Sequence, residues 1–269
     1  MRVLILTKKR LAAIAAGVLA AACLVSIPIV RSSGSVPVQS AEKLLPIYNV
    51  DTQEKKIALT FDAAWGNEDT QQIIRILEEY QAKATFFIVG EWADRYPDDV
   101  RALAQAGHSI QNHSNTHPHM PKLSGDAIAG EITGCNQQLE QLCGKKPIYF
   151  RAPYGDYDNT TVSGAQSLNM QTIQWDVDSL DWKGLIASDI ADRVVKKVQP
   201  GSIILCHNGA KHIVEALPLF IGPLQAQGYR FVTLEELILP DSYTIDANGT
   251  QHFSNPPSPN TQDAAPISE

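Results

Sequence analysis

Positive charge is scarce in this sequence, which has 22 Lys and Arg against 29 Asp and Glu and a formal net charge of −7. No dense cluster of basic residues follows residue 10. Proteins that coat nucleic-acid phosphates usually carry such a cluster, so the sequence argues against a nucleic-acid partner. A neutral or basic partner fits this charge better, and no pattern identifies a protein partner.

Cysteine is also scarce, with four residues in 269. Cys23 lies in an apolar N-terminal segment, and Cys206 has no evident partner. Cys135 and Cys143 lie in a helix-like stretch that would separate them by about 12 Å, whereas a disulfide needs Cα atoms within about 7 Å. We therefore predict no structural disulfide.

A long uncharged apolar run, residues 11–30, follows four basic residues near the start of the chain. A helix of this length spans about 30 Å, the thickness of the hydrocarbon core of a membrane. Its basic flank would stay in the cytoplasm, which places the following residues outside the cell. We predict a single-pass anchor of the cell membrane with an extracytoplasmic domain; secretion after cleavage of a signal peptide is the alternative.

The rest of the chain has the length of one catalytic domain with flanking segments. Residues 1–10 form the basic cytoplasmic segment, and 31–54 indicate a linker that begins with Ser, Gly and Pro. The folded domain is predicted over 55–239. Residues 240–269 contain Asn-Gly, Pro-Pro and Ser-Pro steps and few large apolar side chains, which predicts a flexible tail.

Within the predicted domain, short apolar runs alternate with segments of helical periodicity. Helices are predicted at 70–80, at 97–106 after a proline, and between Ser124 as N-cap and Gly144 as terminator. The predicted strands are 57–61, 84–89, 108–112, 148–151, 171–177, 202–206 and 229–233. Strands that alternate with helices predict a parallel α/β fold, most simply a barrel, with an open doubly wound sheet as the alternative.

Polar residues suited to catalysis follow these predicted strands. They are Asp62, His113, Arg151, Asp178, Asp181 and His207. Parallel α/β folds bring their loops together at the carboxyl ends of the strands. We therefore expect these side chains to share one rim of the domain.

His113 and His117 are four residues apart, a spacing that lets two imidazoles converge on one metal ion. Pro118 disfavours a helix here, so the pair is predicted on a short loop, and two ordinary exposed histidines are the alternative. His119 is a further candidate ligand, more simply a solvated side chain. Asp62 suits a general base if it is partly desolvated, or else it caps the following loop.

His207 can donate a proton to a leaving nitrogen if it faces a metal, whereas a lone histidine at a strand end is more often structural. Asp178 or Asp181 can hold its imidazole and raise its pKa. Arg151 is flanked by apolar residues and, if buried, needs a carboxylate. Asp62 or one of the other two aspartates is the candidate partner.

Five short motifs in this order resemble those of the polysaccharide deacetylase family, also called the NodB homology domain or carbohydrate esterase family 4. They are Thr60-Phe61-Asp62, Asn112-His113-Ser114-Asn115-Thr116-His117-Pro118, Arg151-Ala152-Pro153-Tyr154-Gly155, Asp178-Ser179-Leu180-Asp181-Trp182 and Leu205-Cys206-His207. The resemblance covers about residues 55–239. It implies a distorted (β/α)7 barrel and metal-dependent hydrolysis of acetamido groups on amino sugars in peptidoglycan or chitin-like polymers.

The resemblance also implies catalytic roles. Asp62 matches the general base, and Arg151 matches the residue that orients it. His113 and His117 match two ligands of a divalent metal, most simply zinc. His207 matches the general acid.

Four more positions of the resemblance bear on the substrate. The backbone N–H of Tyr154 matches an oxyanion-binding group, and Asp181 matches the residue that tunes the acid. Leu205 and Trp182 match walls of the acetyl pocket. The rings of Trp182 and Tyr154 are flat surfaces of the kind that pack against sugars, or else they belong to the core.

The first motif departs from the family pattern. Members typically read Thr-Phe-Asp-Asp-Gly, whose second aspartate completes an Asp-His-His metal set, and this chain has Ala63 there, followed by Ala-Trp-Gly. Three outcomes remain open: a metal held by two histidines with water or Asp62 in the gap, a substitute ligand from Asn67, Glu68 or Asp69, or no metal. The Asp-Ala-Ala-Trp-Gly form resembles a subgroup related to sporulation and cell-wall deacetylases of Gram-positive bacteria.

Two functions follow from these observations. The first is an active N-deacetylase of a cell-wall glycan, acting outside the membrane. The second is a carbohydrate-binding pseudoenzyme that has lost its metal, which Ala63 favours. A third hypothesis, a structural protein of the cell envelope, is supported only by the predicted anchor.

Overall fold

A computed structural model of the chain describes residues 43–240 and 242–254. In this part of the chain, no helix is both long and apolar enough to cross a membrane. The predicted anchor at 11–30 and the basic segment at 1–10 lie outside the described residues, as does the first half of the predicted linker, residues 31–42.

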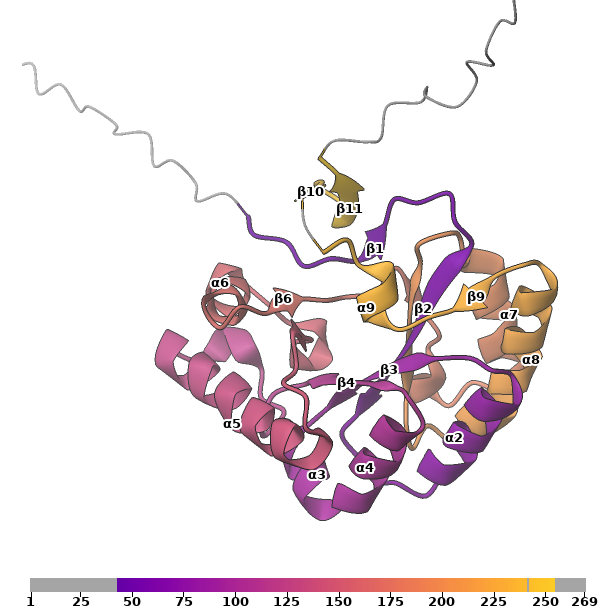
Figure 1. Ribbon diagram of the computed structural model, residues 1–269, viewed down its shortest axis with the longest axis horizontal. Coiled ribbons are helices and arrows are strands. Elements are labelled where there is room, and N and C mark those ends of the chain that lie inside the picture. Colours follow the sequence, from indigo (N-terminus) through magenta and orange to yellow (C-terminus); the bar gives the residue numbers. More distant parts are fainter. Residues whose placement is uncertain (1–42, 241, 255–269) are drawn as a thin grey trace, which may run out of the picture. The chain divides into compact units, whose positions relative to one another are not determined.

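A curled parallel sheet occupies the middle of the domain, with β2 near its centre (Figure 1). The strand order is β6-β5-β4-β3-β2-β8-β7, and β9 pairs with the start of β2. The strands are β2 (Lys56–Ala63), β3 (Ala84–Ile88), β4 (Ser109–Asn112), β5 (Tyr149–Phe150), β6 (Gln171–Thr172), β7 (Val177–Asp178), β8 (Ile203–His207) and β9 (Arg230–Phe231). The parallel α/β fold predicted from the alternating pattern is confirmed.

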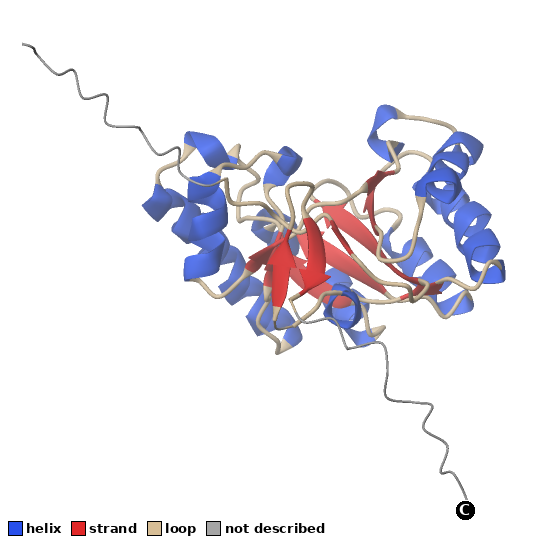
Figure 2. Ribbon diagram, turned by 90° about the horizontal axis from the view of Figure 1, so that it is seen from above, coloured by secondary structure: helices blue, strands red, loops and turns tan. Residues whose placement is uncertain are grey.

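Helices flank the sheet on two sides (Figure 2). They are α2 (Thr70–Glu79), α3 (Gly90–Arg95), α4 (Pro97–Gln105), α5 (Gly125–Cys143), α6 (Asn159–Ser167), α7 (Ala187–Lys197), α8 (Ile213–Ala226) and α9 (Leu234–Leu237), with short 3-10 helices η1 (Met120–Lys122), η2 (Pro153–Gly155) and η3 (Asp181–Lys183). Both predicted ends of α5 are confirmed. The hydroxyl of Ser124 accepts a hydrogen bond from the Ala127 N–H, and Gly144 ends the helix in the left-handed conformation with φ of 71°.

The two faces of β2 differ in chemistry because successive side chains of a strand alternate between faces. Leu59 and Phe61 belong to the apolar cluster that also includes buried residues of α2 and α8. Ala58 belongs to a second cluster, with residues of β3 and β8. By the same alternation, Thr60 and Asp62 share the face of Ala58. The strand therefore carries a polar row that ends at Asp62.

One predicted strand is wrong. The apolar run at 171–177 forms two short strands, of which β6 pairs with β5 at one edge of the sheet and β7 pairs with β8 at the other. Between them, the Gln174 N–H donates to the Ile47 carbonyl, and the Asp176 carboxylate accepts from the Ile203 N–H and the Ser202 hydroxyl. The run crosses from edge to edge, which its composition does not signal.

The predicted flexible tail is also wrong for part of its length. β10 (Tyr243–Ile245) and β11 (Thr250–Phe253) form an antiparallel pair, and β11 pairs in parallel with β1 (Asn49–Val50) from the predicted linker. The buried side chain of Gln251 accepts from the Leu239 N–H and donates to the Leu239 carbonyl. A polar sequence can therefore fold here because its hydrogen bonds are made with the domain.

Replacing Gly130 with Ala is expected to stabilise the domain. Gly130 lies on the exposed side of α5, and a Cβ there would meet nothing within 4 Å. Alanine in an open helical position gains about 0.5–1 kcal/mol over glycine, which corresponds to a rise of about 1–4 °C in Tm. The measurement is thermal unfolding. Gly164→Ala in α6 is the matched control: its Cβ would lie 2.9 Å from Ile128, so an equal gain there would contradict the argument.

Candidate active site

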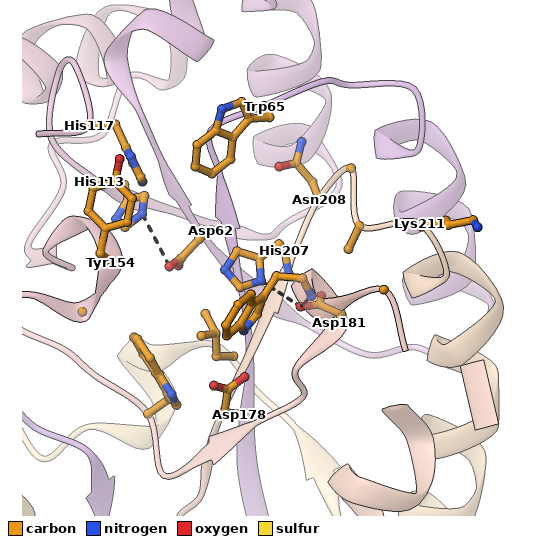
Figure 3. A pocket seen from close by; sticks show the side chains of 17 residues that line it. Asp62, Trp65, His113, His117, Tyr154, Asp178, Asp181, His207, Asn208 and Lys211 are labelled. Atoms are coloured by element: carbon orange, nitrogen blue, oxygen red, sulfur yellow. Dashed lines mark hydrogen bonds and ion pairs between the residues drawn. The ribbon is translucent and has the colours of Figure 1, made fainter. Parts of the chain in front are cut away.

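A cavity of about 720 Å³ opens at the carboxyl ends of the strands (Figure 3). Its lining includes eight of the nine predicted site residues, which come from strand ends and from the loops that follow them. They are Asp62, His113, His117, Asp181, Trp182 and His207, together with Tyr154 and Leu205. Arg151, the remaining predicted site residue, lies buried beneath this rim. The structure therefore brings all the predicted site residues together.

Asp62 and Arg151 form a buried ion pair at the base of the cavity. Arg151 Nη1 donates to Asp62 Oδ1 at 2.7 Å and to the Thr60 hydroxyl at 2.9 Å, and Nη2 donates to the Gln174 carbonyl at 3.0 Å. Burial works to raise the pKa of Asp62, but the charges of Arg151 and the nearby histidines outweigh it and lower the pKa. Asp62 is thus a carboxylate at neutral pH, which a base requires.

His113 presents an unprotonated nitrogen to Asp62. Its Nδ1 donates to the Arg151 carbonyl at 2.8 Å, and its Nε2 lies 3.5 Å from Asp62 Oδ2. Burial lowers the pKa of His113, which favours the neutral ring, so Nε2 carries a lone pair. Two hydrogen-bond acceptors therefore face one another. A cation or a donor such as water fits between them.

His117 sits beside His113, with ring centroids 5.0 Å apart. Its ring makes edge contacts with Trp65 at 4.9 Å and Tyr154 at 4.6 Å, so aromatic side chains set its orientation. Burial, more than the neighbouring His113, lowers the pKa of His117 to about 4. His117 is therefore a neutral imidazole at physiological pH, the form in which histidine binds metals.

The neutral imidazoles of His113 and His117 are suitable ligands for a divalent cation, but two ligands leave its coordination incomplete. Within residues 43–240 and 242–254, no cluster of three or more His, Cys, Asp or Glu side chains has metal-binding spacing. The proposed substitute ligands are engaged elsewhere. Asn67 donates to Asp99, and Asp69 accepts from the Gly209 N–H. Glu68 accepts from the Asn67 N–H, and none of the three lines the cavity.

His207 is held by Asp181 rather than by Asp178. Asp181 Oδ1 lies 2.8 Å from His207 Nδ1, and Oδ2 accepts from the His207 N–H at 2.7 Å. Burial works to lower the pKa of His207, but the hydrogen bond and charge of Asp181, with charges of Asp62 and Asp178, raise it overall. Asp178 instead accepts from the Leu180 N–H. His207 is therefore poised to carry a proton near neutral pH.

Tyr154 and Trp182 both line the cavity and are each 57% exposed. Tyr154 has a left-handed φ of 61° and stacks on His119 at 4.2 Å. His119 is paired with Asp156 at 3.1 Å and does not line the cavity, so it is not an added metal ligand in this structure. The core alternative is excluded for both exposed rings, which remain available for contact with a ligand.

Trp65 is a site residue that the sequence did not reveal. It is 60% exposed, lines the cavity and contacts His117. Its backbone is fixed, because the adjoining Gly66 carbonyl accepts from the Trp92 ring N–H at 2.6 Å and from the Asn208 amide at 3.0 Å. The only sequence signal for Trp65 was its position two residues after Ala63, where the chain departs from the family pattern.

Comparisons with known proteins agree on one family. The family model for polysaccharide deacetylase matches residues 49–173. A peptidoglycan-N-acetylglucosamine deacetylase of Bacillus cereus is 35% identical over 205 residues, covering 75% of this chain and 74% of the relative. The peptidoglycan-N-acetylmuramic acid deacetylase PdaA of Bacillus subtilis is 31% identical over 201 residues, covering 73% of this chain and 76% of its own length.

A similar solved structure raises the question of activity. A family 4 carbohydrate esterase pseudoenzyme from Bacillus anthracis is 35% identical, with a TM-score of 0.69, and the match covers 71% of this chain and 68% of that one. A mutant of that pseudoenzyme with restored enzymatic activity matches with the same TM-score and 36% identity. Relatives of this chain therefore include both deacetylases and a protein described as a pseudoenzyme.

Proposed function

Because the chain belongs to the polysaccharide deacetylase family, we propose that it is an N-deacetylase of amino sugars in cell-wall peptidoglycan. The observation that carries this proposal is the ionised Asp62 beside neutral His113, facing His207 across one cavity. The peptidoglycan substrates named for relatives in Bacillus cereus and Bacillus subtilis support the choice of glycan.

The side chains supply the proton transfers that amide hydrolysis needs. Asp62 takes a proton from the attacking water, and Arg151 holds the carboxylate in place through the 2.7 Å bond. His207, protonated and fixed by Asp181, donates a proton to the leaving nitrogen as the carbon–nitrogen bond breaks. The backbone N–H of Tyr154 stabilises the developing oxyanion. Leu205 and the Trp182 ring form walls of the acetyl pocket.

We also propose that His113 and His117 hold a divalent metal, most simply zinc. Their neutral rings match the ligand chemistry of zinc, and the acceptor pair of Asp62 and His113 leaves a place that suits a cation. A metal held by these two rings would supply Lewis-acid chemistry, polarising the amide carbonyl and making water a stronger acid. Ala63 removes a negative ligand, so metal binding is expected to be weaker than with a complete Asp-His-His set.

A carbohydrate-binding pseudoenzyme is the second candidate, favoured by Ala63 and by the similarity to the Bacillus anthracis protein. Both candidates place the chain against a cell-wall glycan. We propose that it acts there while anchored in the cell membrane by residues 11–30, with secretion after cleavage as the alternative.

Metal analysis and acetate release distinguish the two candidates. The full-length protein, loaded in turn with zinc and other divalent metals, is incubated with N-acetylated peptidoglycan and with chitooligosaccharides. We expect bound metal and released acetate from the wild type, and neither from His113→Ala, because it loses a ligand and the partner of Asp62. If the wild-type protein binds glycan, binds no metal and releases no acetate, the chain is the pseudoenzyme.

A further inference from the structure

Side chains accept hydrogen bonds from most of the backbone N–H groups of the loop that carries both histidines, while backbone bonds to Ile88, Gly90 and Glu91 hold its first residues. We call residues 113–118 the histidine loop. The Ser114 N–H donates to Asn112 Oδ1 at 2.8 Å, and the His117 N–H donates to the Ser114 hydroxyl at 3.0 Å. The two N–H groups between them, of Asn115 and Thr116, donate to a carboxylate on α5. Four consecutive amides thus depend on side-chain acceptors.

That carboxylate is Glu131. Its Oε2 accepts from the Asn115 N–H at 2.9 Å and from the Thr116 N–H at 2.8 Å, while its Oε1 accepts from the Thr116 hydroxyl at 2.8 Å. Hydrogen bonds to an ionised acceptor are stronger than those between neutral groups. One side chain therefore fixes two peptide groups of the histidine loop.

The histidine loop needs such support because its backbone is unusual. Ser114 and His117 have φ values of 68° and 60°, in the left-handed region that residues other than glycine rarely adopt. Conformations of this kind persist only where surrounding contacts over-determine them.

Glu131 is well placed to support the histidine loop and does not itself line the cavity. It projects from α5, whose neighbouring Ile128, Ile132 and Cys135 are fully buried. The Cys135 thiol also donates to the Ile88 carbonyl at the end of β3. The carboxylate is thus carried by a helix that is rigidly packed against the sheet.

We infer that Glu131 is a positioning residue for the proposed metal site: it holds the histidine loop in the conformation that places His113 and His117 together at the cavity. Its effect on metal binding and turnover rests on the proposed function. Its effect on the histidine loop itself does not, so the two can fail separately.

The test compares Glu131→Ala and Glu131→Gln with Glu140→Gln in the full-length protein. Glu140 is an exposed residue of the same helix, and its side chain makes none of these contacts. Glutamine at 131 keeps one acceptor for the loop amides, so it should retain part of the effect. The three measurements are amide hydrogen exchange of peptides that span residues 113–118, zinc binding by calorimetry, and steady-state kinetics.

We expect exchange at Asn115 and Thr116 to be about 10- to 100-fold faster in Glu131→Ala, less so in Glu131→Gln, and unchanged in Glu140→Gln. Zinc affinity should fall about 10- to 100-fold, and kcat should fall with KM unchanged. Unchanged exchange in the histidine loop would overturn the inference. So would faster exchange that extends equally through β2, β3 and β4, since Glu131 would then serve general stability.

If the wild type neither binds zinc nor releases acetate, the proposed function fails and the exchange measurement alone decides the inference. Faster exchange confined to the histidine loop would then support Glu131 as the residue that holds it. Normal exchange with weakened zinc binding would count against it, because the route through loop conformation would be absent.

Discussion

Asp62→Asn is expected to reduce acetate release by about 10²- to 10⁴-fold, the range by which a positioned general base accelerates a reaction. The lowered pKa of Asp62 keeps the native carboxylate ionised at neutral pH, ready to accept a proton. The asparagine amide is almost the same size but has no basic oxygen. Zinc should remain bound, because His113 and His117 are unchanged.

The same substitution also affects stability, and this effect needs its own control. Arg151 is fully buried, and Asp62 is its carboxylate partner. Leaving a buried charge without its partner costs on the order of 3 kcal/mol, so part of any loss could come from unfolding. Thr60→Val removes a different acceptor of Arg151 and keeps the base.

Kinetics, zinc binding and urea unfolding are therefore measured on both variants, at denaturant concentrations where each is folded. Thr60→Val should lose stability yet retain most of the turnover per folded molecule. Asp62→Asn should lose turnover in fully folded protein. Undiminished acetate release from Asp62→Asn would exclude Asp62 as the base.

Ala63→Asp is expected to tighten zinc binding by more than about tenfold, since each added 1.4 kcal/mol or so of attraction between carboxylate and cation gives a factor of ten. Activity should rise with zinc occupancy at limiting metal. The substitution restores the Asp-Asp sequence that the family pattern has at this place. The measurements are zinc titration by calorimetry and acetate release at increasing zinc concentrations.

The stability of Ala63→Asp should depend on metal. Ala63 is 1% exposed and lies in the apolar cluster beside Ala64, so a carboxylate there without a cation costs on the order of 3 kcal/mol. Zinc should recover this loss, because a ligand that binds only the folded state stabilises it. Ala63→Asn is the control of similar size without charge. If zinc stabilises both variants equally, the new carboxylate does not reach the metal.

Much of the site could be predicted from the polar residues at the carboxyl ends of the predicted strands. Asp62 and His207 end neighbouring strands in register, since Asp62 pairs with His207 across β2 and β8. Arg151 follows β5, and its need for a carboxylate identified Asp62 among its candidate partners. Local patterns suffice here because parallel strands must deliver their carboxyl ends to one rim.

What the sequence could not supply depends on distant contacts. The strand-end pattern left both Asp178 and Asp181 open as partners of His207, and only the family resemblance singled out Asp181, whose carboxylate contacts the His207 ring and N–H. Trp65 acquires its place from hydrogen bonds that Trp92 and Asn208 make to Gly66. Contacts between residues far apart in the sequence leave no periodic signal, so periodicity and strand ends alone identified neither the His207 partner nor Trp65.

The pairing of β1 with β11 makes the two ends of the described domain neighbours. Asn49 lies opposite Thr250, and Val50 lies opposite Gln251, so about two hundred residues are closed into a ring by one short strand pair. A chain cut at residue 239 would open that ring, free the buried Gln251 contacts and expose the edge of β1. The unit suited to expression or circular permutation therefore extends from 43 to 254, beyond the boundaries set by the motifs.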